Sequence, residues 1–305
     1  MITFGLSTSW NASKRKSGSV IVDEIKNAGF DNVELNFSLT ADIVDEIASI
    51  VKRGGIKVSS LHNFCPIPKG VSHDKASPDY YSLASVDEDE RKRSVHFTAQ
   101  TINKAAELGA YAVVLHCGKV ERKDPTRRLI ELLDKKEEAL LEFKKIREKM
   151  FIERESGAKV HFERLLQSLD ELNAIAVKRD IILGIENRFY YMEMPSAAEI
   201  SDILEKLDGS RLFYWHDVGH AQVWEALGIL KHRDLLETLG CKIAGFHFHD
   251  VKGARDHLAP GCGDFDFSIL KPYVNESAIK IIEAHQPATL DEVKRSKEYL
   301  NSILS

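Results

Sequence analysis

Several features that define other protein classes are missing from this sequence. The formal net charge of its 305 residues is −5, so no overall basic field attracts the chain to nucleic acid or to an anionic membrane. No run approaches the about 18 apolar residues of a membrane-spanning helix, and the N-terminus has no basic segment followed by an apolar one. We therefore expect a cytoplasmic protein without membrane or nucleic-acid partners.

Cysteine motifs and phosphate-binding glycine motifs are also absent. The four cysteines lie far apart and form no C-x-x-C pair, which fits a reducing cytosol. No G-x-G-x-x-G follows the first strand-like segment, which weakens a dinucleotide-binding interpretation. The chain contains no low-complexity tract and no linker, so we expect residues 1–305 to form one domain.

Strand-like and helix-like segments alternate along the whole chain. Eight short apolar runs predict strands that are buried on both faces. They are Ile2–Leu6, Asn32–Leu35, Lys57–Leu61, Tyr111–His116, Ile181–Glu186, Leu212–His216, Lys242–His247 and Ile279–Glu283. Amphipathic stretches separate them, and several of these end in glycine, as helices before a short loop do. Repeated units of this kind predict an α/β fold, a (β/α)₈ TIM barrel.

Two insertions interrupt this rhythm. Pro66–Glu90 is long and turn-rich and follows the third strand on the catalytic face, so we expect a substrate lid. Lys119–Ser156 follows the fourth strand and mixes Lys, Arg and Glu with helical apolar spacing. It predicts one long solvated helix that is followed, after Gly157, by a second helix. Its exposed face is the expected surface for a homo-oligomer, if one forms.

Four of the predicted strands end in an acidic or imidazole side chain. A charged group at the end of such a strand must be paired or metal-bound, because burial of an uncompensated charge is unfavourable. The C-terminal ends of barrel strands meet at the catalytic face, so these side chains predict an oxygen-rich divalent-metal site with one nitrogen. They are Glu186, Asp217, His247 and Glu283. Glu34, after the second strand, is either a hydrogen-bond partner of this site or a salt-bridged barrel residue.

Further histidines follow the same and other strands. His62 and His116 each end an apolar strand, where a histidine is either a metal ligand or a satisfied interior residue. His220 lies three residues after the aspartate of HDVGH, which lets both point into one site. His247 and His249 share one face of a strand, because side-chain direction repeats every two residues. We assign His247 as the ligand, while His249 orients it or contacts substrate.

The order of these motifs resembles a known family. LHNF, VVLHCG, GIENR, HDVGHA, FHFHD, HLAPGCGDFDF and IIEAH follow one another along the chain. Together they are similar to the xylose isomerase-like TIM-barrel superfamily. That superfamily includes sugar and sugar-phosphate isomerases and epimerases, inosose dehydratase and the AP endonucleases of family 2. The resemblance implies a metal site at the C-terminal face of the barrel, with the ligands Glu186, Asp217, His247 and Glu283.

The endonuclease IV-type members of this superfamily imply additional ligands. They carry further zinc ligands at positions that match His62, His116, His220 and His257. In those enzymes a further ligand is an aspartate two residues before the last histidine. The residue at that position in this chain is Arg255, and the nearest aspartate, Asp256, lies one position later. The resemblance therefore leaves a two-metal site open and weakens a third metal position.

Three reactions are compatible with these residues. We expect first a sugar or sugar-phosphate isomerase or epimerase, in which Glu186 and Glu283 take and return a proton while the metal stabilises an enediolate. The alternatives are a zinc-dependent phosphodiesterase of the endonuclease IV type and a lyase that resembles inosose dehydratase. The metal is Mn, Zn, Co or Mg. The candidate contacts to a carbohydrate substrate are Arg188, His249, Lys252, Arg255, Trp10 and Phe64.

Overall fold

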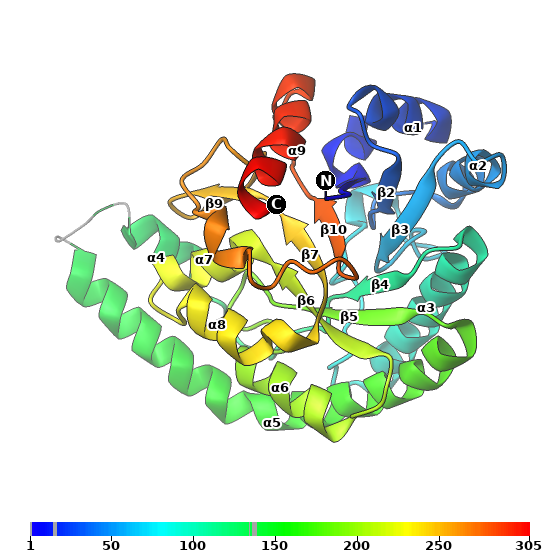
Figure 1. Ribbon diagram of the computed structural model, residues 1–305. Coiled ribbons are helices and arrows are strands. Elements are labelled where there is room, and N and C mark those ends of the chain that lie inside the picture. The colour runs from blue at the N-terminus through cyan, green and yellow to red at the C-terminus, as the bar shows by residue number, and fades with distance from the viewer. Residues whose placement is uncertain (1, 15–16, 134, 136–138) are drawn as a thin grey trace.

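Eight parallel strands close into a barrel in the computed structural model, which describes residues 2–14, 17–133, 135 and 139–305 (Figure 1). The strand order is β1-β10-β7-β6-β5-β4-β3-β2. The barrel strands are β1 Gly5–Ser7, β2 Asn32–Leu35, β3 Lys57–His62, β4 Ala112–Leu115, β5 Ile182–Glu186, β6 Leu212–Asp217, β7 Ile243–Phe248 and β10 Ile279–Ile282. The prediction of a (β/α)₈ barrel is confirmed.

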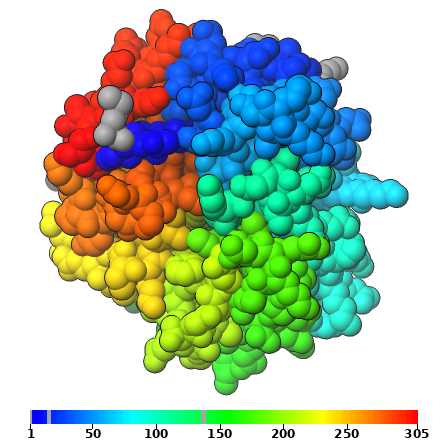
Figure 2. Space-filling model, turned by 45° about the vertical axis from the view of Figure 1, so that its right-hand side comes forward, coloured from blue at the N-terminus to red at the C-terminus, as the bar shows by residue number. Residues whose placement is uncertain are grey.

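Helices surround the barrel on its outside. They are α1 Gly18–Asn27, α2 Ala41–Lys52, α3 Glu88–Leu108, α4 Thr126–Leu133, α5 Leu140–Arg179, α6 Ala197–Lys206, α7 Val218–Ala226, α8 His232–Leu239 and α9 Leu290–Leu304. Figure 2 shows successive segments as sectors around the molecule, with the N-terminal part beside the C-terminal part. This closure follows from the pairing of β1 with β10. Within the described chain, no helix combines the length and the apolar character that crossing a membrane requires.

The helical insertion after β4 differs from its prediction. The structure has a short α4 and then one helix of 40 residues, α5, which continues through Gly157. A Cβ at Gly157 would lie 2.8 Å from Cγ1 of Val120, so this glycine lets α5 pack closely against the segment after β4. The predicted break was wrong because an interior glycine costs a helix only about 1 kcal/mol, which close packing offsets.

The C-terminal part of the loop after β3 is held against α5. Nδ1 of His161 lies 2.8 Å from the carbonyl oxygen of Ala84, and the hydroxyl of Ser168 donates to the carbonyl oxygen of Leu83 at 2.7 Å. Both donors are buried residues of α5. The long loop predicted at Pro66–Glu90 is present, although α3 already begins at Glu88. Its function as a lid stays a prediction.

A small hairpin after β7 was not predicted. Its strands are β8 Asp250–Lys252 and β9 Arg255–Leu258, which pair antiparallel outside the barrel. The carboxylate of Asp250 accepts hydrogen bonds from the backbone amides of Gly261 at 2.8 Å and Phe265 at 3.1 Å. These bonds fix the segment that follows the hairpin. The strands are too short and too polar for an apolar alternation to indicate them.

The inside of the barrel is filled largely by one aromatic ring. Trp215 of β6 is fully buried and packs with Ala112, Val114 and Ile281. The strands on either side of β6 carry glycine where the ring lies. A Cβ at Gly245 would be 2.2 Å from Cζ3 of Trp215, and one at Gly184 would be 2.7 Å from Cε3. The two glycines therefore make room for the indole.

We predict that Gly245→Ala destabilises the fold by about 1–3 kcal/mol, because the new methyl group overlaps the Trp215 ring. The free energy of unfolding from urea titration measures this loss. The same substitution in a Trp215→Phe background should cost less, because the smaller ring leaves space. Equal costs in the two backgrounds would show that the indole is not the source of the strain.

Candidate metal centre

Three carboxylates converge on one nitrogen at the C-terminal end of the barrel. Nδ1 of His247 lies 2.8 Å from Oε1 of Glu186 and 3.1 Å from Oε2 of Glu283. Oδ2 of Asp217 is 3.7 Å from the same nitrogen. All four side chains are buried, and ligand atoms of the four lie within 4.8 Å of one another. Three carboxylates and an imidazole are a donor set that fits a divalent metal.

A fourth carboxylate fixes the orientation of His247 from the other side. Nε2 of His247 lies 3.1 Å from both carboxylate oxygens of Glu34, which also accepts a hydrogen bond from Ser60 at 2.7 Å. When Nε2 carries the proton and donates to Glu34, the lone pair of Nδ1 faces the three converging carboxylates. Of the two interpretations of Glu34, the structure supports the hydrogen-bond partner of the site.

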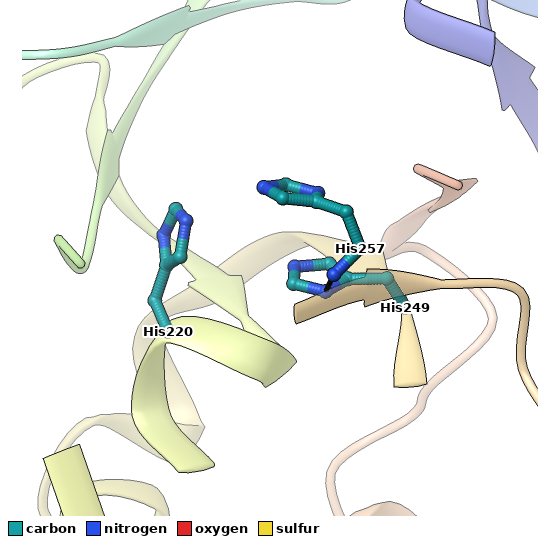
Figure 3. A group of neighbouring side chains, drawn as sticks. All are labelled: His220, His249 and His257. Atoms are coloured by element: carbon teal, nitrogen blue, oxygen red, sulfur yellow. Dashed lines mark hydrogen bonds between the residues drawn. The ribbon is translucent and has the colours of Figure 1, made fainter. Parts of the chain in front are cut away.

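Asp217 is held by contacts from two sides. It caps α7, where its Oδ1 accepts from the backbone amide of His220 at 2.7 Å, and Nε2 of His249 lies 2.9 Å from the same oxygen. Nδ1 of His249 accepts from the backbone amide of His257 at 2.8 Å (Figure 3). Both ring nitrogens of His249 are thus engaged. We conclude that His249 positions Asp217.

The other four candidate histidines share one arrangement. In each ring, Nδ1 lies within hydrogen-bond distance of an oxygen: Asn63 O at 3.2 Å for His62, Asp79 Oδ2 at 3.1 Å for His116, Asn187 O at 3.1 Å for His220 and Glu283 O at 3.3 Å for His257. Carbonyl and carboxylate oxygens accept only, so Nδ1 donates, and Nε2 is the atom that offers a lone pair when the ring is neutral. This is the arrangement of histidines that bind metals.

The free Nε2 atoms point toward carboxylates. Nε2 of His62 and of His116 lie 3.7 Å and 2.8 Å from Oε2 of Glu186. Ligand atoms of these three residues lie within 4.8 Å of one another and form a second possible metal group, which shares Glu186 with the first.

A third group lies around the hairpin. His220 projects from the first turn of α7 toward the stacked rings of His249 and His257 (Figure 3). Asp256 Oδ2 lies 3.9 Å from Nε2 of His220 and 3.6 Å from Nε2 of His257. The shifted aspartate thus faces these histidines, whereas Arg255 is exposed. Asp256 therefore supplies a carboxylate beside these histidines, although Arg255 occupies the position at which the family resemblance implies an aspartate.

Members of all three groups line a cavity of about 580 Å³ at the C-terminal end of the barrel, although Asp217, His247 and His249 are not part of its lining. Phe37, Phe189 and Tyr190 form aromatic parts of its wall. A larger cavity, of about 840 Å³, lies at the opposite end, around Gly5 and Lys280. None of the three described metal-ligating groups borders it, and Nζ of Lys280 already donates to the carbonyl oxygen of Ala278 at 2.6 Å. We therefore place the functional site in the smaller cavity.

The predicted substrate contacts have different positions. Arg188 lines the cavity. Lys252 and Arg255 are exposed on the hairpin and do not line it. Trp10 is buried and donates to the carbonyl oxygen of Ala288 at 2.9 Å, and Phe64 is buried against Tyr81. Substrate binding by Lys252, Arg255, Trp10 and Phe64 therefore stays a prediction, and none of these four residues lines the cavity.

Several cavity residues were missed by sequence reasoning. Asp79 of the loop after β3 contacts His116, and Glu193 after β5 contacts Arg188. His285, two residues after Glu283, stacks on His257 with ring centroids 3.8 Å apart. The IIEAH motif contained the signal for His285. Asp79 and Glu193 lie in loops whose sequence indicates no position in space.

The neighbouring imidazoles keep the site carboxylates ionised. Burial would raise the pKa of Glu186, but hydrogen bonds with His116 and His247 hold it well below its usual value. Burial opposes the ionised form of Asp217 too, yet its pKa is lowered by His220 and His249. The carboxylates are thus ready to bind a cation.

A buried hydrogen-bond chain supports the ends of β5 and β6. The hydroxyl of Tyr214 lies 2.8 Å from Oδ1 of Asn187 and 2.7 Å from Nδ1 of His216, whose Nε2 lies 2.9 Å from Nε2 of His232. Burial lowers the pKa of His216 well below its usual value and that of His232 to about 3. Both rings are neutral, so one donates to the other. Asn187 accepts from the backbone amide of Asp217 at 2.8 Å and thereby links this chain to the site.

The fold places the chain among the TIM barrels, and comparison with known proteins identifies the family. Residues 22–303 match the xylose isomerase-like TIM barrel family, so the chain belongs to it. No match was found among curated proteins.

Solved structures have the same fold at low sequence identity. A D-tagatose 3-epimerase-like protein is 19% identical, with 99% of this chain and 97% of that chain covered and a TM-score of 0.69. The 3-keto-D-glucoside 4-epimerase YcjR from E. coli is 15% identical, with coverages of 99% and 100% and a TM-score of 0.68. The IOLI protein, whose structure holds a zinc atom, is 13% identical, with coverages of 100% and 98% and a TM-score of 0.69.

We predict that Glu34→Gln weakens divalent-metal binding by roughly 10–100-fold, because His247 loses the carboxylate that fixes its tautomer. Competition with a chromophoric chelator measures the dissociation constant. Glu107→Gln, the same change on an exposed side chain that forms an ion pair with Lys104, is the matched control and should bind metal as the unaltered protein does. An unchanged affinity in Glu34→Gln would contradict the assigned role.

Proposed function

We propose that the protein is a divalent-metal-dependent isomerase or epimerase of sugars that works by proton transfer. The observation that carries this proposal is the pair Glu186 and Glu283, whose carboxylate oxygens lie 2.8 Å and 3.1 Å from Nδ1 of His247 and which line the same cavity. They come from β5 and from the residue after β10, strands separated by β6 and β7 in the barrel. Two carboxylates at one metal position suit a reaction that removes a proton and returns it elsewhere.

Glu186, Asp217, His247 and Glu283 would hold the metal, which when bound stabilises negative charge that develops on the substrate carbonyl oxygen. Oε2 of Glu283 faces His247, while Oε1 lies 4.0 Å from Nε2 of His285. Glu283 accepts the proton from the carbon next to the carbonyl, and the electron pair of that C–H bond forms the enediolate double bond. In an isomerisation Glu283 delivers this proton to the neighbouring carbon. In an epimerisation Glu186 must enter the step as the carboxylic acid; it gives its proton to the other face of the same carbon and is left ionised, while Glu283 keeps the proton that it took.

The charge of the cavity favours an uncharged substrate. Six carboxylates line it, those of Asp79, Glu131, Glu186, Glu193, Asp256 and Glu283, against the two guanidinium groups of Arg127 and Arg188. A bound metal compensates part of this excess, whereas a phosphate would add to it. The aromatic walls at Phe37, Phe189 and Tyr190 suit the C–H faces of a sugar. The proposed substrate is therefore a ketose or a related free sugar.

The named activities of the similar structures support this assignment. Two are described as a D-tagatose 3-epimerase-like protein and a 3-keto-D-glucoside 4-epimerase, and the third carries zinc. A keto sugar is the common substrate type of the two epimerase names. The metal is proposed to be Mn, Zn, Co or Mg, since the oxygen-rich set and the added imidazoles suit these ions to different degrees.

We predict that Glu283→Gln lowers proton exchange by roughly 10²–10⁴-fold, because the amide cannot accept the proton from carbon. Incubation of the metal-loaded protein with a panel of ketoses in heavy water, followed by proton NMR, measures loss of the exchanging C–H signal. Glu155→Gln on the exposed face of α5 is the matched control and should retain full exchange. Exchange at the original rate in folded Glu283→Gln would refute the role of this carboxylate.

A second candidate is a zinc phosphodiesterase of the endonuclease IV type, which the free Nε2 atoms of His62, His116, His220 and His257 favour. It requires two metals about 3.5–4 Å apart. Cleavage of abasic DNA by the zinc-loaded protein, with no deuterium exchange into any sugar, would favour this candidate. A lyase of the inosose dehydratase type would be recognised in the same NMR experiment by loss of a hydroxyl-bearing carbon signal.

A further inference from the structure

The side chain of Arg188 turns back toward the end of its own strand. It lies two residues after Glu186 and is 3% exposed. Its Nη1 donates to Oε2 of Glu186 at 2.8 Å and contacts Nε2 of His116. Its Nη2 lies 3.3 Å from Oε1 of Glu193 and 3.7 Å from Oδ2 of Asp79. Three carboxylates thus hold one guanidinium group in place.

The position of Nη1 coincides with a possible metal position. His62, His116 and Glu186 have ligand atoms close enough to hold an ion, and Nη1 contacts two of these three residues through the atoms that would bind it. A metal bound to an imidazole nitrogen and a carboxylate oxygen lies about 2.0–2.2 Å from each. A neutral imidazole nitrogen has a single lone pair, so an ion and Nη1 compete for Nε2 of His116 and exclude each other there.

Arg188 cannot yield this position by losing its proton, because a guanidinium remains charged in proteins. A divalent ion could enter only if the side chain moved away from Glu186, Glu193 and Asp79 together. That movement would leave Glu193, whose side chain is 10% exposed, without its cation, which is unfavourable for a buried carboxylate. Asp79 is 32% exposed and keeps its contact with His116. Arg188 thus already occupies the second group, whereas in the four-residue group around His247 it contacts only the shared Glu186.

We propose that Arg188 is a built-in cation that closes the His62–His116–Glu186 group to metal. The chain then binds its divalent ion at the Glu186–Asp217–His247–Glu283 group, an assignment that rests on the proposed function, and the second group holds the guanidinium. Nε2 of His62 is left to accept a hydrogen bond from a substrate hydroxyl. A metal pair that shares Glu186 does not form, and the phosphodiesterase reaction that needs such a pair is not available to this chain.

Metal stoichiometry tests the proposal without an activity assay. The protein and its variants are equilibrated with excess Co²⁺, dialysed and subjected to elemental analysis, and the visible absorption of bound Co²⁺ is recorded. Arg188→Ala should bind one more Co²⁺ per chain than the unaltered protein. The double variant Arg188→Ala/His62→Ala should lose this additional ion, which assigns it to the second group. Arg127→Ala, which removes an exposed arginine at the cavity rim, should leave the count unchanged.

A second measurement avoids dependence on the folding of Arg188→Ala. His62→Ala in the unaltered background should keep the Co²⁺ count and the absorption spectrum, because His62 binds no metal while Arg188 is present. A loss of one Co²⁺ in this variant would overturn the proposal. So would an equal count in folded Arg188→Ala and the unaltered protein.

Asp217→Asn separates this proposal from the proposed function. Asp217 belongs to the four-residue group and not to the second one, so its substitution should remove the ion of the unaltered protein. Retention of that ion in Asp217→Asn would contradict the metal site of the proposed function. The additional ion expected in Arg188→Ala is counted in a separate variant, so its presence or absence does not depend on the result for Asp217→Asn.

Discussion

The need to neutralise buried negative charge organises the C-terminal end of this barrel. Glu186, Asp217 and Glu283 converge on one nitrogen of His247, and Glu34 approaches the same ring from the other side. Four carboxylates around a single buried imidazole are stable only with further cations or hydrogen-bond donors. The neighbouring histidines, the backbone amide that caps Asp217 and the guanidinium group of Arg188 all serve this requirement. Glu186, Asp217, Glu283 and His247 also form a donor set that suits a divalent ion.

The residues that face this position could be predicted from sequence because they lie at the ends of strands. A closed parallel barrel brings all C-terminal strand ends to one face, so Glu186, Asp217, His247 and Glu283 had to lie near one another once eight strands were recognised. The same reasoning located His62 and His116. The structure also supports Glu34 as the partner of His247, although the sequence left a salt-bridged residue equally open.

Positions that depend on loops could not be predicted in the same way. Asp79 and Glu193 reach the cavity from segments without regular periodicity, and the hairpin carries Lys252 and Arg255 away from it. The hairpin also turns Asp256 toward the histidines, which its position in the sequence, shifted by one, could not reveal. Likewise, the continuation of α5 through Gly157 depends on a close contact with Val120, and such long-range packing has no local signature.

The length of α5 has a mechanical consequence. At 40 residues, with a rise of about 1.5 Å per residue, the helix extends over roughly 60 Å. Through His161 and Ser168 it holds the loop after β3, and through Arg154 it holds the carbonyl oxygen of Tyr191 after β5 at 2.9 Å. The helix α5 thus contacts both the loop after β3 and the segment after β5, two strands that are separated only by β4 in the barrel. A displacement of α5 would therefore move these two segments together, as one mechanical unit.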